Sequence, residues 1–291
     1  MKTLSLAAYP ALPSSTQAAA TPPAPTLLRR AAEVLRVLHR ISSPLAWAGW
    51  LNVALALLAL GLLPLDHRLV SGALVWLKPL KFALSIVAYA WTLAWLLADL
   101  PAPAQPAVRR IAWGVALSMV VEQVVIFTQA ARGTTSHYNA ATPLDGALFG
   151  LMGVFIMANT GLMAWALYLA WRYRPHGSAA YGWGVRLGLL VFLVGSAVGG
   201  IMVHHLGHTV GAPDGGPGLP GLGWSTRAGD LRLAHFMGLH ALQALPLLGW
   251  ATGRWVPRRA VLLMWVGTAL YVAVVAGLFA QAMAGQPLLS L

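Results

Sequence analysis

Apolar residues occur in seven long runs, separated by shorter polar stretches. A helix of about 20 mostly apolar residues matches the hydrocarbon thickness of a bilayer. The pattern therefore predicts an all-α protein, a polytopic bundle of seven transmembrane helices. The predicted spans are residues 44–64, 79–99, 111–131, 146–171, 182–203, 233–252 and 260–283.

The chain before the first span differs in composition. Residues 1–26 are rich in Ala, Pro, Ser and Thr, which favours a disordered tail over the alternative of a signal peptide. Residues 27–43 place Arg29, Arg36 and Arg40 on one face and leucines on the other, which predicts an amphipathic interfacial helix or simply a stop before the first span. Residues 44–291 form the predicted transmembrane domain.

Composition and charge support a membrane protein. The chain is 58% hydrophobic and only 9% charged, whereas a soluble domain has about 25% charged residues. The net charge of +12 comes from Lys and Arg dispersed at the ends of the spans, so it does not indicate nucleic-acid binding. The chain has no Cys, so a metal would need His, carboxylate or amide ligands.

The distribution of Lys and Arg predicts the orientation. The N-terminal tail and the connections after spans two, four and six hold thirteen of the nineteen, and the opposite side holds six. This bias predicts that the N-terminus is inside and the C-terminus outside. The long loop 204–232, rich in Gly and Pro, then lies outside and is typical of a covering or binding loop.

Glycines repeat along the fifth predicted span. Gly184, Gly188, Gly195 and Gly199 share one helix face. Small residues at this spacing let two helix backbones approach closely. We therefore expect a close helix contact at this face.

Polar residues form stripes in the outer halves of spans two, three and six. Ionisable groups at membrane depth are costly, so we expect them to gather in a pocket that opens outward. We predict that Lys81 pairs with Glu122, with Arg132 as second choice, and that Glu122, Lys81 and His240 carry acid–base chemistry, although a purely structural ion pair is an equal alternative. The other expected pocket residues are Ser85, Gln129, Arg132, His137, Asp230, Arg232, His235 and Gln243.

Three histidines are candidate metal ligands. His204 and His208 are four residues apart and share a face if the fifth span continues that far, and His240 could complete the set. Such a set would suit a haem or a transition metal. The alternative for His204 and His208 is that they are solvated loop residues.

Several segments together resemble a family of bacterial multi-helix membrane proteins. They are Lys78–Phe82, Gln129–Asn139, and the stretch from Pro213 through Gly229 and His240 to Pro246. The resemblance covers roughly residues 44–290 and implies a multi-pass fold, and the Ala, Leu and Arg bias suggests a bacterial plasma membrane. It implies no activity. A seven-helix hydrolase of the ceramidase and progestin-receptor type does not fit, because His235 and His240 are five residues apart instead of four.

Three functional hypotheses follow. The first is a haem- or transition-metal-binding membrane oxidoreductase, or another membrane enzyme, acting on a small or lipid-soluble substrate. The second is a proton-coupled transporter for a small solute. The third is a structural subunit of a membrane complex. Membrane lipids are the expected surroundings in each case.

Overall fold

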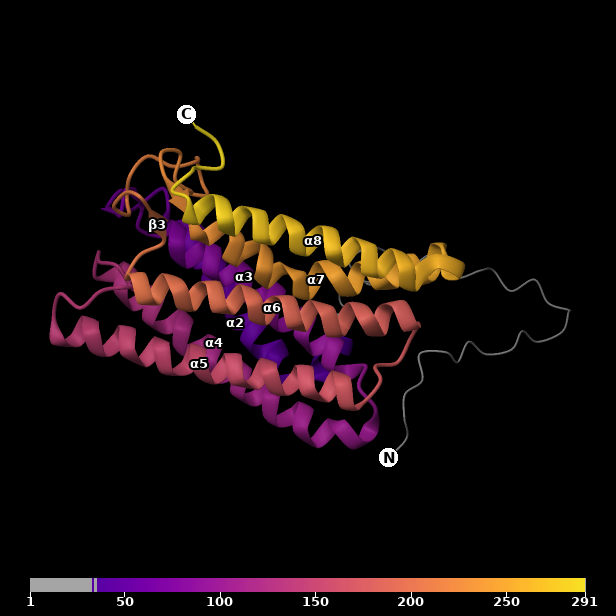
Figure 1. Ribbon diagram of the computed structural model, residues 1–291. Coiled ribbons are helices and arrows are strands. Elements are labelled where there is room, and N and C mark those ends of the chain that lie inside the picture. Colours follow the sequence, from indigo (N-terminus) through magenta and orange to yellow (C-terminus); the bar gives the residue numbers. More distant parts are fainter. Residues whose placement is uncertain (1–32, 34–35, 291) are drawn as a thin grey trace, which may run out of the picture.

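The computed structural model describes residue 33 and residues 36–290 (Figure 1). The predicted tail 1–26 lies outside the described residues, as does most of the predicted interfacial helix 27–43. The described residues 36–41 are helical. The chain then enters the first long helix.

In the part of the chain that the structure describes, seven helices of 20 to 30 residues lie side by side (Figure 1). They are α2 (Ser43–Leu62), α3 (Leu77–Ala98), α4 (Gln105–Ala131), α5 (Pro143–Arg172), α6 (Ala179–His205), α7 (Leu231–Trp255) and α8 (Ala260–Met283). Short 3-10 turns, η1 (Ala102–Ala104) and η2 (Pro257–Arg259), precede α4 and α8. The predicted all-helical fold is confirmed.

Six of these helices are long and apolar enough to cross a membrane, and α7 is the exception. The protein is therefore an integral membrane protein. Helix α7 carries Arg232, His235, His240 and Gln243, which lower its hydropathy. The number of seven spans and the orientation stay predictions.

The connections differ between the two ends of the bundle. Residues 63–76, 132–142 and 206–230 lie together at one end, here called the loop end, and the other connections are short (Figure 1). Two short antiparallel strand pairs form there. In one, β1 (Leu69–Val70) pairs with β2 (Ala73–Leu74), and in the other, β3 (Thr209–Val210) pairs with β4 (Gly229–Asp230). The loop end is thus the ordered, polar end of the molecule.

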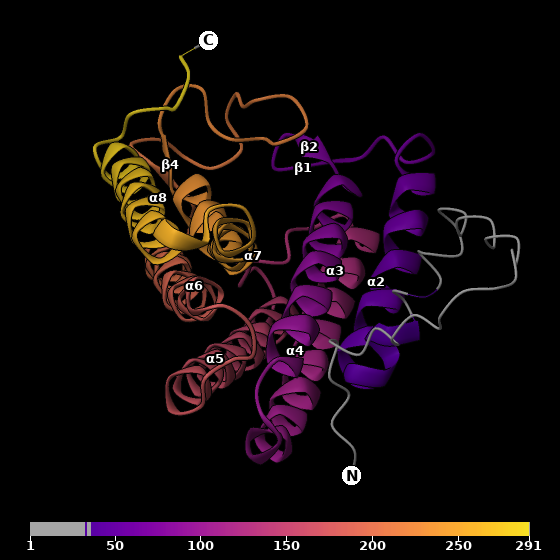
Figure 2. The ribbon, with the colours of Figure 1, turned by 90° about the vertical axis from the view of Figure 1, so that its right-hand side faces the viewer.

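Viewed along the bundle, α6, α7 and α8 form one group and α2, α3 and α4 another, with α5 beside α4 and α6 (Figure 2). The predicted glycine contact is confirmed as the contact between α6 and α7. A Cβ atom on Gly195 would lie 2.6 Å from the carbonyl carbon of Gly238, and one on Gly188 would lie 2.9 Å from the carbonyl oxygen of Ala241. Helix α3 contacts α7 only sparsely, and this thinly packed border between the two helices is here called the α3–α7 seam.

Candidate functional site

A chain of three ionisable side chains lies close to the loop end, in which Glu122 is buried and Lys78 and His137 are half-buried. The Lys78 ammonium, in the first turn of α3, lies 3.2 Å from Nδ1 of His137. Nε2 of the same imidazole lies 3.4 Å from Oε1 of Glu122 on α4. The ring therefore bridges a cation from one helix and a carboxylate from the next.

The loop after α4 brings His137 into this position. Gly133 and Tyr138 have φ angles of +73° and +56°, which turn the chain back toward the bundle. The Asn139 amide holds the loop closed by donating to the Thr134 hydroxyl at 3.0 Å and to the carbonyl of Thr135 at 2.9 Å. His137 is consequently part of the bundle interior and does not lie above it.

The protonation of His137 follows from its surroundings. Burial lowers the pKa of His137, the nearby Lys78 charge lowers it further, and the bond to Glu122 acts in the opposite direction. A neutral ring is thus favoured at neutral pH. Since an ammonium can only donate, Nδ1 accepts from Lys78 and Nε2 carries the proton that faces Glu122. The Ser136 hydroxyl, 3.1 Å from Nδ1, is compatible with the same tautomer.

The carboxylate of Glu122 makes fewer hydrogen bonds than its two oxygens can accept. Its side chain is buried, and Oε2 has no hydrogen-bond partner among the described residues. Aromatic rings surround the neighbouring imidazole, with centroids 5.6 Å away for Phe82, 6.0 Å for Tyr138 and 6.4 Å for Phe149. A carboxylate with one free oxygen in such surroundings can accept a proton or a hydrogen bond from another molecule.

A second carboxylate, Asp145 in the first turn of α5, lies nearby and is fully engaged. It accepts from the Gln129 amide at 2.8 Å, from the Thr142 hydroxyl at 2.7 Å and from Arg132 at 2.5 Å. Arg132 also donates to the Gln129 side-chain oxygen. This network joins the end of α4 to the start of α5.

Loop 206–230 covers the N-terminal ends of α3 and α7, which lie at the loop end. The Lys81 ammonium donates to the carbonyl of Leu222 at 3.0 Å, and Arg232 donates to the carbonyl of the next residue, Gly223. Arg232 also forms an ion pair of 2.6 Å with Asp230, whose Oδ1 accepts the Arg232 backbone N–H at the start of α7. Two cations from two helices therefore hold neighbouring carbonyls of one loop.

His208 belongs to this loop and lies between two carboxylates. Its Nδ1 is 3.2 Å from Asp214 and 3.9 Å from Asp230. Burial first, and then the charge of Arg232, lowers the pKa of His208 to about 4, although the two carboxylates oppose the shift. The neighbouring Asp214 also fixes the loop by accepting the backbone N–H of Thr209 at 2.9 Å.

The remaining predicted site residues lie along α7 and α3. His240 contacts Gln243, with Nδ1 3.2 Å from its side-chain oxygen, and its ring is 4.2 Å from that of Phe236. The His235 ring donates through Nδ1 to the carbonyl of Gly195 at 2.7 Å, which strengthens the α6–α7 contact. Ser85 is exposed on the surface of the bundle.

Two sequence-based pairings differ from the structure. Lys81 and Arg132 were the predicted partners of Glu122, but Lys81 bonds the loop carbonyl and Arg132 bonds Asp145. The partner of Glu122 is His137, because the loop after α4 folds inward. The structure thus joins Glu122 to Lys78, one helical turn from Lys81.

The predicted metal ligands do not converge. Helix α6 ends at His205, and the next residue, Leu206, has a left-handed conformation (φ +53°), so His208 leaves the face that carries His204. His204 is exposed, and the His240 ring contacts Gln243 and Phe236. Among the described residues, no group of three His, Asp or Glu side chains is arranged to hold a metal ion.

Sequence reasoning had not chosen Lys78, Asp145 or Asp214 as site residues. Lys78 was detectable, because it is three residues before Lys81 on the same face of the helix. Asp145 had a local signal as well, since Thr142 precedes it by three residues, the spacing of a helix cap. Asp214 had none, because its role depends on the path of loop 206–230.

Comparison of the chain with protein-family models, with curated proteins and with solved structures found no match.

Proposed function

We propose that this protein is a membrane enzyme whose acid–base centre is the chain Lys78–His137–Glu122, open toward the loop end. We further propose that α7 is a seventh span and that the loop end faces outward in a plasma membrane. The observation that carries the proposal is the His137 imidazole held between the Lys78 ammonium and the buried Glu122 carboxylate. An ionised side chain within a membrane has a high free energy unless it is paired with another group or takes part in function.

The geometry suits transfer of a proton between the two ends of the chain. If the ammonium gives a proton to Nδ1 while Nε2 gives its proton to Glu122, the products are a neutral amine, the other imidazole tautomer and a protonated carboxyl group. No net charge is created, which favours such a step in an apolar site. A substrate that takes a proton from one end, or gives one to the other, would be activated by general acid–base catalysis.

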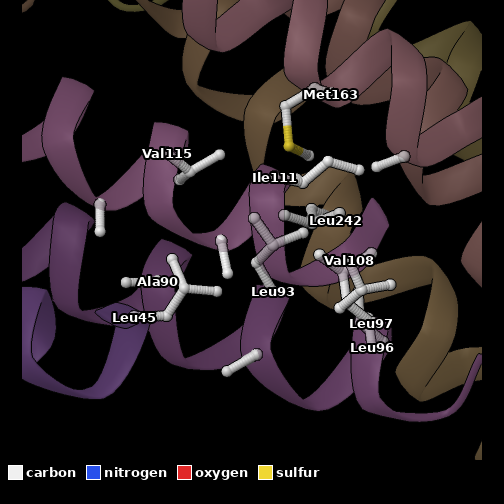
Figure 3. Close-up of a cluster of buried hydrophobic side chains, with 14 of the residues drawn as sticks. Leu45, Ala90, Leu93, Leu96, Leu97, Val108, Ile111, Val115, Met163 and Leu242 are labelled. Carbon is white, nitrogen blue, oxygen red and sulfur yellow. The ribbon is translucent and has the colours of Figure 1, made fainter. Parts of the chain in front are cut away.

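The interior on the far side of Glu122 favours an enzyme over a transporter. The buried side chains that continue from Glu122 toward the opposite end are mostly apolar, among them Val115, Ile111, Leu93 and Met163 (Figure 3). Ser118, the polar residue one turn below Glu122, donates to the carbonyl of Gly114 in its own helix. A proton-coupled transporter needs polar groups along a path that reaches both sides.

Acid–base chemistry by protein groups also accounts for the site better than a haem or a transition metal. Metal sites in proteins need several converging ligands. The histidines proposed as ligands from the sequence, His204, His208 and His240, have other neighbours in the structure. Glu122 and His137 alone provide two donors, and Lys78 occupies the remaining ring nitrogen.

The proposal is tested by nitrogen NMR of the full-length protein in lipid, with labelled histidine and with H137Q to assign the signals. We expect a neutral His137 ring at pH 7, with the proton on Nε2. In K78M, which removes the ammonium donor, we expect a mixture of tautomers. An imidazolium at pH 7, or a ring signal that does not change in K78M and E122Q, would contradict the proposal.

Proton flux in liposomes separates the transport alternative. An enzyme of the proposed kind gives no protein-dependent flux, whereas flux that E122Q abolishes would favour a transporter. For the structural-subunit alternative, a partner retained by the intact protein and lost on deletion of residues 211–224 would be the supporting result.

A further inference from the structure

The seam between α3 and α7 combines features that the acid–base centre does not use. It begins at the loop end between Lys81 and Arg232 and continues toward the opposite end along one face of each helix. Its polar and aromatic residues on α3 are Ser85, Thr92 and Trp95, and those on α7 are Phe236, His240, Gln243 and Trp250. The side chains of Phe236 and Trp250 are exposed, as is that of Trp95.

A shallow cavity of about 400 Å³, wide open on one side, lies in the far part of this seam. Its walls are mainly apolar, and exposed side chains at its rim leave it open toward the surrounding lipid. The lining residues are Thr92, Trp95 and Leu96 from α3, Tyr181 from α6, and Leu242, Gln243, Pro246, Leu247 and Trp250 from α7. An apolar cavity with a few polar groups is typical of a ligand site.

At the loop end of the seam, the positive charges of Lys81 and Arg232 favour the binding of an anion. Lys81 takes part in no ion pair among the described residues, and its ammonium donates to the neutral carbonyl of Leu222. It lies in the second turn of α3, and the first turn of this helix, where the dipole is positive, contains no acidic residue. Arg232 adds a second cation from α7, although Asp230 neutralises part of its charge.

The distance between the two ends determines the length of the occupant. From Lys81 to Trp95 along α3, and from Arg232 to Trp250 along α7, the separations are about 21 Å and about 27 Å at 1.5 Å per residue. One leaflet of the hydrocarbon core is about 15 Å thick, half of the whole core. A ligand that reaches both the cations and the bottom of the cavity must therefore be longer than one leaflet is thick.

We propose that the α3–α7 seam binds a membrane lipid with an anionic phosphate head group and a tail longer than one leaflet, the chemistry of a polyisoprenyl phosphate. The head group lies between Lys81 and Arg232 under loop 206–230, and the tail occupies the cavity beside Trp95 and Trp250. This proposal does not depend on the proposed acid–base function, because neither cation belongs to the chain Lys78–His137–Glu122.

The experiment measures how much lipid the detergent-purified, full-length protein retains after size exclusion. The probes are undecaprenyl phosphate, the uncharged undecaprenol, the short farnesyl phosphate, a phosphatidylglycerol with ordinary acyl chains, and inorganic phosphate. We expect retention of undecaprenyl phosphate near one per protein and much less of each other probe. Equal retention of undecaprenol or of phosphatidylglycerol would overturn the proposal.

Variants locate the site. K81Q should lower retention of undecaprenyl phosphate about tenfold, the loss expected for one charge-assisted hydrogen bond, and K81R should retain it. T92W, which fills the cavity, should also lower it. The matched controls are R68Q, at another cation of the loop end, L117W, on the exposed face of α4, and E122Q. Unchanged retention in K81Q and T92W, or an equal loss in R68Q and L117W, would disprove the assignment.

Discussion

The loop end holds two buried carboxylates that differ in how completely their surroundings satisfy them. Asp145 accepts from Gln129, Thr142 and Arg132, and each of these partners is close in the chain or on the neighbouring helix end. Glu122 has His137 at 3.4 Å and an oxygen without a partner among the described residues. The first arrangement is typical of a structural link, and the second is typical of a group kept available for chemistry.

The sharpest test of this contrast compares D145N with E122Q in thermal unfolding of the detergent-solubilised protein. We expect D145N to cause the largest fall in melting temperature of all the variants considered, because Arg132 loses its ion-pair partner. E122Q removes a buried charge and keeps the shape, so its melting temperature should stay the same or rise. Equal falls in both variants would contradict the distinction.

Replacement of His137 should have the next largest effect. H137A leaves both Lys78 and Glu122 without a buried partner, and we expect a loss of about 1–3 kcal/mol in the free energy of unfolding. The double variant H137A/E122Q should lose less than H137A alone, because the stranded carboxylate is then neutral. A double-mutant cycle measured by denaturant unfolding checks this, and strict additivity would show that the two groups do not interact.

Two half-buried histidines of the loop end, His137 and His208, predict a dependence of stability on pH. The pKa values of His137 and His208 are lowered from 6.5, to about 4 for His208, so below pH 6.5 the unfolded chain binds more protons than the folded one. Stability should therefore be complete above pH 6.5 and fall as the pH drops toward 4, by at most about 1.4 kcal/mol per pH unit for each group. H208Q should reduce the slope of melting temperature against pH between 6.5 and 4, and an unchanged slope would show that His208 does not contribute.

The smallest effect concerns the attachment of loop 206–230. K81Q removes one charged hydrogen bond to a carbonyl at the half-exposed edge of the seam, so we expect less than about 1.5 kcal/mol of destabilisation. Limited proteolysis should nevertheless cut loop 206–230 faster in K81Q than in the parent, with R68Q as control. Identical cleavage rates would show that Lys81 does not hold the loop.

The helices were predictable because each depends on a local pattern of apolar residues, and all seven predicted spans correspond to helices of the structure. The glycine contact between α6 and α7 was predictable for the same reason. The partner of Glu122 was not, because it depends on the positive φ angles of Gly133 and Tyr138, which redirect a polar loop into the bundle. The separation of His204 from His208 similarly depends on one left-handed residue, Leu206.

Gly195 of α6 and Gly238 of α7 bring the two backbones into direct contact. If either helix slid along the other or moved away from it, this contact would be lost. Helices α6 and α7 must consequently move as a single rigid body, and α8, which packs on both, moves with them. Relative motion of the two groups of helices is least restrained at the sparsely packed border with α3, which Lys81 and Arg232 flank at the loop end. The α3–α7 seam is thus the part of the helix bundle where the packing permits most relative movement, and it is open to the surrounding lipid.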